Sequence, residues 1–435
     1  MTARAEPGGP FAPLLAELDK CARCGECRVV CPVFAQMRRE KFTAKGKVAL
    51  IRAAAHGDIG FSDGFYESLG NCLLCMACVE RCSTGVRTDA LVTAARAAFV
   101  EHRGLKAAQR IVRRGLLAGP GTKRAASRLQ RLLFARLPER SGMRARFPLP
   151  LLRADQVVPE LTARPFRDRP RRPGPQAPTE TAIFFTGCMA NHAYTSVAEA
   201  VVDVLEALGV RVIVPPDQTC CGAAMFINGD RATARDLART NAEALGAALA
   251  AHPGARIVVP CSTCGLTLTR HHLELLADEE SMAARARTVA GATMDISQYL
   301  VDVIGSGRIK ASLAGAVTRS TTYHDPCHLA RGLGVRAQPR DLLALACGDN
   351  FTDMAEADRC CGMAGTYFLA NPATSRAIQE RKMDNVAASK ARLVATGCPA
   401  CMLQIDDGLA RRGLPARALH TVEILAMAMG LEPES

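Results

Sequence analysis

The residues of this chain with the clearest chemical potential are its cysteines, of which there are 19 in 435 residues. Two strings, "TCCGAA" at 219–224 and "RCCGMA" at 359–364, each place two adjacent cysteines before a glycine. The first twenty residues lack a basic segment followed by an apolar core, so they do not read as a secretory signal. In a reducing compartment, clustered cysteines are metal ligands more often than disulfides. We therefore expect metal sites.

Two runs of four cysteines near the N-terminus share the spacing C-x2-C-x2-C-x3-C, in "CARCGECRVVCP" and "CLLCMACVERCS". This run holds [4Fe–4S] cubanes in two-cluster ferredoxins, where the fourth cysteine ligates the other cluster. Zinc sites usually need two C-x-x-C pairs, which fits these runs less well. We assign the ligands of two [4Fe–4S] clusters as follows: Cys21, Cys24, Cys27 and Cys82 for the first, and Cys72, Cys75, Cys78 and Cys31 for the second.

The insert between the two runs contains a helical pattern at "KGKVALIRAAAHG". This part of the chain resembles the helical ferredoxin module of succinate dehydrogenase iron–sulfur subunits more than a compact bacterial ferredoxin. One departure is Ser83, which follows Cys82 where proline is usual. Because that residue shapes the turn and is not a ligand, the assignment is unchanged.

The C-terminal part is an internal duplication. Cys188 and Cys327 are 139 residues apart, the two CCG strings 140, and the two C-x-x-C pairs 137. Near-constant offsets over three landmarks indicate a repeat. Each copy supplies five cysteines, and the two sets are Cys188, Cys220, Cys221, Cys261 and Cys264, and Cys327, Cys360, Cys361, Cys398 and Cys401.

Apolar runs and amphipathic stretches alternate through this region in the order strand, helix, strand, helix, strand, which predicts a layered α/β domain with mostly parallel strands. Five thiolates at the strand ends of such a sheet favour an iron–sulfur cluster. We predict an α plus α/β fold in four parts: a helical ferredoxin domain (1–100), a basic, proline-rich linker with amphipathic helices (101–180), and two repeats (181–310 and 311–435).

These motifs resemble the CCG domains of heterodisulfide reductase-type proteins. Their order resembles the iron–sulfur subunits of glycolate oxidase, D-lactate dehydrogenase and anaerobic glycerol-3-phosphate dehydrogenase, over about 20–115 and 180–430. "KGKVALIR", "CSTGVR" and "CCGMAGTY" carry the local similarity. In heterodisulfide reductase, complete five-cysteine sets hold non-cubane [4Fe–4S] clusters. The resemblance therefore implies one or two further clusters here, of a type that stays open.

The alternatives for these cysteines are a thiol or structural pair, or a strained disulfide between adjacent residues. The remaining cysteine, Cys347, is expected to be a small buried hydrophobe. Three polar residues around Cys327, namely His324, Asp325 and His328, could tune a cluster or relay a proton. We favour hydrogen bonding to the loop.

The sequence shows no G-x-G-x-x-G fingerprint after a strand and no P-loop. By resemblance, FAD is expected only on a partner dehydrogenase subunit, and this chain would pass electrons from that flavin toward quinone. The favoured substrates are glycolate or D-lactate, with glycerol 3-phosphate as an alternative. Two other hypotheses stay open: a disulfide or thiol reductase acting through a CCG-bound cluster, and a cluster-bearing regulatory or nucleic-acid-binding protein.

The net charge of +13 is concentrated in residues 101–173, which carry 19 Lys and Arg against 5 Asp and Glu. "LKAAQRIVRRGLLAG" and "KRAASRLQRLLFARL" show helical spacing with basic and apolar faces. Such helices could contact an anionic membrane surface or a quinone, dock an acidic partner, or pack on the chain itself. No recognition motif supports nucleic-acid binding. No apolar run of 18 residues occurs, so we expect a cytoplasmic protein without a transmembrane segment, with peripheral contact to the inner face of the membrane as an open alternative.

Overall fold

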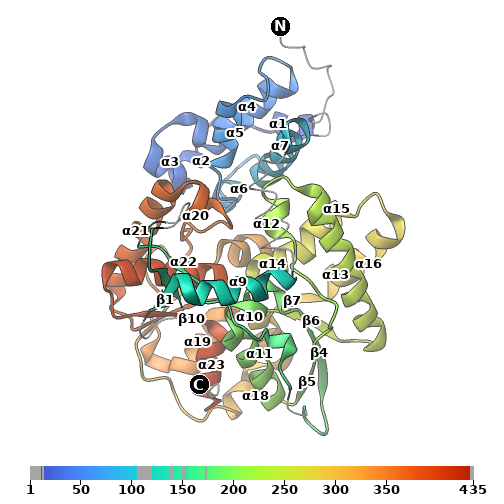
Figure 1. Ribbon diagram of the computed structural model, residues 1–435, viewed down its shortest axis with the longest axis vertical. Helices are drawn as coiled ribbons and strands as arrows, with labels where there is room; N and C mark the ends of the chain where they lie inside the picture. The colour runs from blue at the N-terminus through green and yellow to red at the C-terminus, as the bar shows by residue number, and fades with distance from the viewer. Residues whose placement is uncertain are drawn as a thin grey trace.

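The computed structural model describes residues 11, 14–104, 120–137, 142–148, 153, 155–171 and 174–431, with side chains in the helix at 120–133 from residue 126 onward. Helices and parallel sheets alternate over most of it, as expected from the sequence. The helical N-terminal module lies at one end of the long axis, above the two sheet-containing repeats (Figure 1).

The N-terminal module is built from helices and loops, with no strand among its described residues. Its longest insert helix begins where the Thr43 hydroxyl accepts a hydrogen bond from the Gly46 amide. A Cβ on Gly46 would collide with the Glu40 carbonyl, so the chain needs glycine there. The elements are α1 (Leu15–Asp19), α2 (Cys27–Val30), α3 (Pro32–Met37), η2 (Glu40–Phe42), α4 (Ala44–Ala55), α5 (Asp63–Gly70), α6 (Ala77–Glu80) and α7 (Thr88–Arg103).

The basic segment is partly folded. The first of its two amphipathic patterns, 105–119, lies outside the described residues. The helix expected over 123–137 ends at Leu133, because the next three residues pair with a strand and bury Phe134. The described elements are α9 (Pro120–Leu133), η4 (Phe166–Asp168) and an antiparallel sheet of β1 (Phe134–Arg136), β2 (Met143–Ala145) and β3 (Val157–Val158).

The first repeat is built on a parallel sheet in the order β5-β4-β6-β7. The predicted strand–helix–strand–helix–strand order is present as β4, α11, β5, α13 and β6. The elements are β4 (Glu180–Phe184), α10 (Gly187–His192), α11 (Thr195–Ala207), β5 (Val210–Ile213), α12 (Ala223–Phe226), α13 (Arg231–Ala251), β6 (Arg256–Val259), α14 (Ser262–Leu266), η5 (Thr267–His271), α15 (His272–Leu275), α16 (Glu280–Ala292), β7 (Thr293–Asp295), α17 (Ile296–Tyr299), η6 (Leu300–Ile304) and α18 (Ser306–Ala311).

The second repeat has a smaller parallel sheet in the order β10-β9-β8. Both sheets contribute to one continuous aliphatic core. The elements are β8 (Thr321–His324), η7 (His328–Leu333), α19 (Ala337–Cys347), η8 (Gly348–Asn350), α20 (Tyr367–Ala370), α21 (Pro372–Ser389), β9 (Leu393–Thr396), α22 (Pro399–Arg412), β10 (Arg417–His420) and α23 (Thr421–Ala428).

The helical module packs directly on both repeats. On one side, Val33, Phe42 and Leu73 share a buried cluster with Tyr367 and Ile378 of the second repeat. On the other side, the apolar faces of α4, α5 and α7 share a cluster with α12 and α13 of the first repeat. The module therefore sits across both halves of the duplication.

Candidate metal centres

The first ferredoxin set converges on one cavity, which is lined by Cys21, Cys24, Cys27 and Cys82. Arg23 and Gly25 have positive φ, which curls the loop before α2. Cys82 arrives from the second run, and its sulfur accepts a hydrogen bond from the Val86 amide at 3.4 Å. The four thiols come together as the cross-over spacing predicts.

The second set lines a neighbouring cavity with Cys31, Cys72, Cys75 and Cys78. Cys31 caps α3, and its sulfur accepts from the Phe34 amide at 3.4 Å. Leu74 and Met76, on either side of Cys75, both have positive φ, so the loop is tightly wound. Cys78 also lines the first cavity, so the two cavities adjoin. Both cavities draw thiols from both runs and have the donor chemistry that [4Fe–4S] cubanes require.

The first CCG set gathers at one edge of the first sheet. The thiols of Cys188 and Cys220 interact, and Cys264 interacts with both Cys221 and Cys261. These contacts need close backbone approach. Gly187 has φ +63°, and a Cβ there would lie 3.0 Å from the Cys264 sulfur.

The second CCG set repeats the arrangement. Cys327 interacts with Cys360, and the Cys361 and Cys401 sulfurs are 3.6 Å apart. Cys398 caps α22 and interacts with Cys401. Gly362 has φ +94°, and a Cβ there would lie 2.8 Å from the Ser375 carbonyl oxygen. In each repeat the five thiols thus form one connected series of contacts, in which four are buried and Cys188 or Cys327 is partly buried.

In each adjacent pair, the second cysteine has a lowered pKa. Hydrogen bonds from Cys220 and Cys264 hold the pKa of Cys221 well below its usual range, although burial opposes this. Cys360 and Cys401 do the same for the pKa of Cys361. The thiolate is the form of cysteine that binds a metal. The pKa values of the neighbouring Cys264 and Cys401 are raised instead, by their hydrogen bonds to these sulfurs and by burial. The sulfurs of all 19 cysteines are free of disulfide bonds.

The sets are not isolated from one another. Cys75 of the second ferredoxin set interacts with Cys360 of the second CCG set. Cys398 of that CCG set interacts with Cys261 of the first CCG set. Thiol contacts therefore link the helical module to the second repeat and the second repeat to the first.

The three polar residues around Cys327 differ in their partners: the His324 side chain contacts a loop carbonyl, whereas the side chains of Asp325 and His328 contact side chains on helices. His324 Nδ1 lies 3.1 Å from the Ala357 carbonyl, and burial lowers the pKa of His324 to about 3. The His324 ring also lies near the Cys361 and Cys401 sulfurs, with ligand atoms within 4.8 Å of one another. The Asp325 carboxylate accepts two hydrogen bonds from Arg340, at 2.9 and 2.6 Å.

His328 reaches further than the loop that carries it. Its Nδ1 lies 3.0 Å from the Thr263 hydroxyl of the first repeat. Its Nε2 lies 3.3 Å from the Leu74 carbonyl, inside the second ferredoxin loop. His328 thus ties three cysteine-bearing segments together.

Two buried lysines lie beside the thiols and are missed by reasoning from cysteine motifs. Lys47 lines the cavity of the second ferredoxin set, and Lys382 lies near Cys360 and Cys361. The sequence does carry a signal for them. Lys47 falls on the stripe formed by Ala44, Val48 and Ile51, and Lys382 stands four residues from Ile378 and Val386. A lysine on an apolar helical stripe indicates a buried charge.

No helix in the described ranges is both long and apolar enough to cross a membrane. The sequence matches the 4Fe-4S dicluster domain family over residues 17–86 and the cysteine-rich domain (CCG) family over residues 182–269 and 321–406.

Three relatives illustrate the similarity. A probable glycolate oxidase iron-sulfur subunit of Bacillus subtilis is 30% identical over 95% of this chain and 94% of its own length. One of the subunits of the dihydromethanophenazine:CoB–CoM heterodisulfide reductase of Methanosarcina mazei is 26% identical over 96% of this chain and 95% of its own length. Lactate utilization protein A of an Exiguobacterium species is 30% identical over 56% of this chain and 96% of its own length.

The domain order, the two repeats and the full-length similarity all indicate the same family. The chain belongs to the family of glycolate oxidase-type iron–sulfur subunits, in which a 4Fe-4S dicluster domain precedes two cysteine-rich domains.

Proposed function

We propose that this chain is the electron-transfer subunit of a flavin-dependent 2-hydroxy-acid dehydrogenase complex that acts on glycolate or D-lactate and delivers electrons toward quinone. The observation that carries the proposal is that the four cysteine sets adjoin one another. Cys78 lines both ferredoxin cavities, and contacts at Cys75–Cys360 and Cys261–Cys398 join the second ferredoxin set to the second CCG set and that set to the first. The similarity to glycolate oxidase and lactate utilization proteins supports the substrate class.

The residues of the chain would hold the clusters and shield them from water. The eight ferredoxin cysteines would hold two [4Fe–4S] clusters, and each five-cysteine set would hold a further iron–sulfur cluster. When bound, such clusters accept and release one electron at a time. Most of the CCG cysteines are buried, as is Cys75, so the protein excludes water from these sulfurs. Hydrogen bonds from the Phe34 and Val86 amides would offset negative charge on the Cys31 and Cys82 sulfurs.

The test is anaerobic purification from the native cell, with iron counting, EPR and identification of bound partners. We expect a co-purifying flavoprotein and reduction of the EPR-active clusters on addition of glycolate or D-lactate. Reduction by glycerol 3-phosphate alone would transfer the assignment to that substrate. Absence of a flavoprotein, with clusters unresponsive to all three compounds, would refute the dehydrogenase proposal. A yield of about eight irons with cubane signals only would remove clusters from the CCG sets.

A disulfide reductase is the second candidate, because both five-cysteine sets are complete and largely buried and a heterodisulfide reductase subunit is similar over nearly the full length. In that case a disulfide would take up two electrons and two protons and leave as two thiols. Turnover of a disulfide by the isolated chain with an artificial electron donor would favour it. Cys361→Ser should then abolish turnover, and Cys347→Ala should not.

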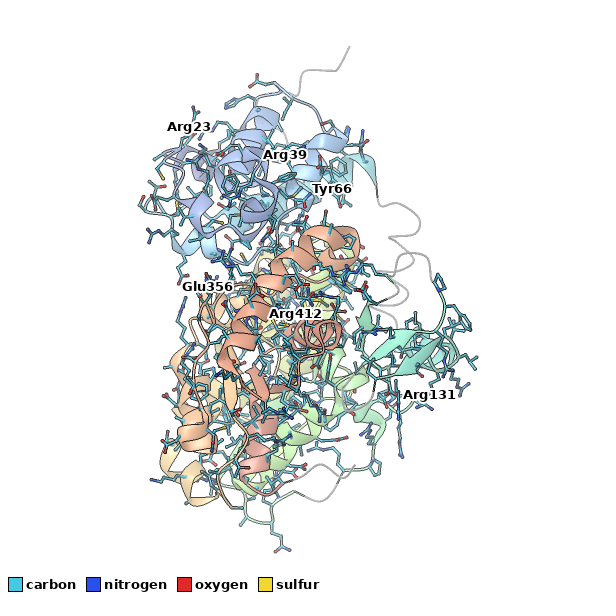
Figure 2. All side chains as sticks on the ribbon, turned by 90° about the vertical axis from the view of Figure 1, so that its left-hand side faces the viewer. Arg23, Arg39, Tyr66, Arg131, Glu356 and Arg412 are labelled. Atoms are coloured by element: carbon cyan, nitrogen blue, oxygen red, sulfur yellow. The ribbon has the colours of Figure 1, made fainter. Side chains whose placement is uncertain are left out.

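We also propose that the basic segment contacts an anionic membrane surface. Leu129 and Leu132 on α9 are 55% and 72% exposed, and Phe147 after β2 is 63% exposed. Arg128, Arg131 and Arg146 lie beside them, and Figure 2 shows Arg131 at the outer side of this substructure. Exposed apolar side chains among arginines match an interface of anionic lipid headgroups.

Vesicle sedimentation tests this contact. The chain should pellet with phosphatidylglycerol vesicles, less with phosphatidylcholine, and less at high salt. Leu132→Asp should weaken pelleting several-fold, whereas Val303→Asp, at an exposed apolar residue of the first repeat, should not. Equal pelleting of both variants would show that α9 is not the contact.

A further inference from the structure

Lys47 and Lys382 are the most deeply buried lysines in the described part of the chain, at 2% and 0% exposure. Lys47 Nζ donates to the Phe42 carbonyl. Lys382 Nζ donates to the carbonyls of Glu356 and Ala357, at 2.6 and 3.1 Å. Carbonyl groups satisfy the hydrogen bonds of an ammonium group without cancelling its charge. Burying a charge that contacts only neutral dipoles costs free energy of desolvation. A negatively charged group near each lysine would offset that cost.

We call the second ferredoxin set and the second CCG set the two inner sets, and the first ferredoxin set and the first CCG set the two outer sets. Both lysines lie beside cysteines of the inner sets. Lys47 lines the cavity of Cys31, Cys72, Cys75 and Cys78 and acts electrostatically on Cys31 and Cys78. Lys382 interacts electrostatically with Cys361 and Cys360. These are the two sets that meet at the Cys75–Cys360 contact. One positive charge thus stands on each side of that junction.

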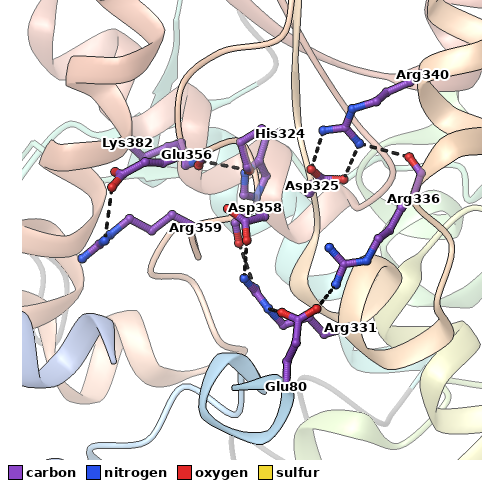
Figure 3. A network of polar contacts seen from close by, with 11 residues as sticks. Glu80, His324, Asp325, Arg331, Arg336, Arg340, Glu356, Asp358, Arg359 and Lys382 are labelled. Atoms are coloured by element: carbon purple, nitrogen blue, oxygen red, sulfur yellow. Dashed lines mark hydrogen bonds and ion pairs between the residues drawn. The ribbon is translucent and has the colours of Figure 1, made fainter. Parts of the chain in front are cut away.

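The other cations at the junction are matched by carboxylates, as Figure 3 shows. Arg331 lies between Glu80 at 2.8 Å and Asp358 at 2.6 Å. Glu356 is paired with Arg381 and, at 3.5 Å, with Arg359. Arg331 acts on Cys75 and Cys327 as well, but it shares its charge with two carboxylates in direct ion pairs. Lys47 and Lys382 form no salt bridge with a carboxylate of the described residues, although Asp358 and Glu356 act on Lys382 from a greater distance.

The two outer sets lack such a charge among the described residues. In the first repeat, Asn241 donates to the Cys220 carbonyl. Arg167 caps the preceding loop at Pro216 and Gln218, but it is half-buried and faces Asp168 and Asp217. Beside the first ferredoxin set, Lys45 is partly exposed and pairs with Glu40 at 2.9 Å.

We propose that Lys47 and Lys382 raise the reduction potentials of the two inner sites above those of the two outer sites, so that a two-electron donor fills the inner pair first. Each arriving electron adds one negative charge, and a buried ammonium stabilises that charge more than solvent-screened cations do. The reductant is the reduced flavin of the proposed complex, which would supply one electron to each inner site. The inference rests on the proposed cluster content.

The experiment compares Lys47→Met and Lys382→Met with the parent holoprotein in an EPR-monitored redox titration. Each variant should lower the midpoint potential of its neighbouring site only, and should move that site later in the order of reduction. Lys390→Met, at the exposed C-cap of α21, is the control for Lys382 and should leave all potentials unchanged. Lys45→Met on α4 is the control for Lys47 and should leave the potentials of the two inner sites unchanged.

Arginine variants separate charge from packing. Lys382→Arg, if it retains iron, should restore the parental potential, which a purely structural role would not require. Unchanged potentials in both methionine variants with full iron content would overturn the inference and leave the proposed function intact. If the parent protein itself binds no iron, the proposed function fails instead.

Discussion

Cys75 connects the helical module to the second repeat. The positive φ of Leu74 and Met76 turns its side chain into the loop, and the second repeat buries it against Cys360. The neighbouring Cys360 and burial raise the pKa of Cys75 well above its usual value. Such a thiol is a poor thiolate unless a metal withdraws its proton. Metal binding and correct docking are thus linked at one sulfur.

Substitution of this residue should remove one cluster and leave the other. Cys75→Ser is expected to lower bound iron by about four atoms per chain and to abolish one of the two cubane EPR signals. Cys347→Ala is the control, because Cys347 is fully buried at the end of α19 and belongs to none of the four sets. It should retain all iron. Equal iron loss in both variants would contradict the ligand assignment.

At the scale of elements, several ligand loops end in helix N-termini. Cys31 caps α3 through its sulfur, Cys261 and Cys398 occupy the N-cap positions of α14 and α22, and Cys27 begins α2. The positive end of a helix favours a thiolate, and free amides there can donate to sulfur. The same helix-start geometry recurs on α17, where Asp295 accepts from the Ser297 amide at 2.8 Å.

Asp295 should make the first repeat less stable as the pH rises. Burial raises the pKa of Asp295 to about 7, so the native state keeps a proton that the unfolded chain releases near pH 4. Stability therefore falls between about pH 4 and 7 and then levels off. Asp295→Asn keeps the cap without the buried charge. It should be roughly 4 kcal/mol more stable at pH 8, since each pKa unit is worth about 1.4 kcal/mol, and unchanged at pH 4.

Urea unfolding followed by circular dichroism across this pH range would check the expectation. Asp302→Asn, at a partly exposed residue of η6, serves as the control and should show no pH-dependent gain. A variant at position 295 that tracks the parent protein at every pH would show that the carboxylate is already ionised in the native state.

The sequence was informative where chemistry or periodicity is local. The repeat could be predicted from the constant offsets between cysteine motifs, and the strands β4, β5 and β6 from short apolar runs. The Cys75–Cys360 and Cys261–Cys398 contacts could not, because they depend on how domains dock across more than a hundred residues. The strands β1 to β3 escaped prediction for a related reason. They are two or three residues long and held by tertiary contacts, such as the Val157 amide on Asp407 at 2.9 Å.

At the scale of the whole molecule, Arg96 fastens the module to the first repeat. It is buried, and it donates to the carbonyls of Ile227 at 2.7 Å, Leu69 at 2.7 Å and Cys72 at 2.8 Å. Gly229, with φ +86°, lets the chain pass against the Arg96 backbone, where a Cβ would collide with the carbonyl oxygen. The glycine at position 229 thus allows the helical module to pack against the first repeat.

Gly229→Ala should loosen this interface. We expect a loss of roughly 2–4 kcal/mol in unfolding free energy and faster hydrogen exchange in α7 and α12, since both the clash and the positive φ disfavour alanine. Gly246→Ala, in open space within α13, should instead be neutral or stabilising by up to about 1 kcal/mol. Unchanged exchange at the interface in the Gly229 variant would disprove the role.

The unequal burial of the two ferredoxin sets has a consequence for how the protein is made. Cys24 is exposed to solvent, whereas Cys75 is covered by the second repeat. Reagents that modify thiols should therefore reach Cys24 in the folded protein before they reach Cys75. Cys75 becomes covered only when the helical module and the second repeat pack together, so a metal bound at Cys75 would be enclosed by the assembly of the two domains.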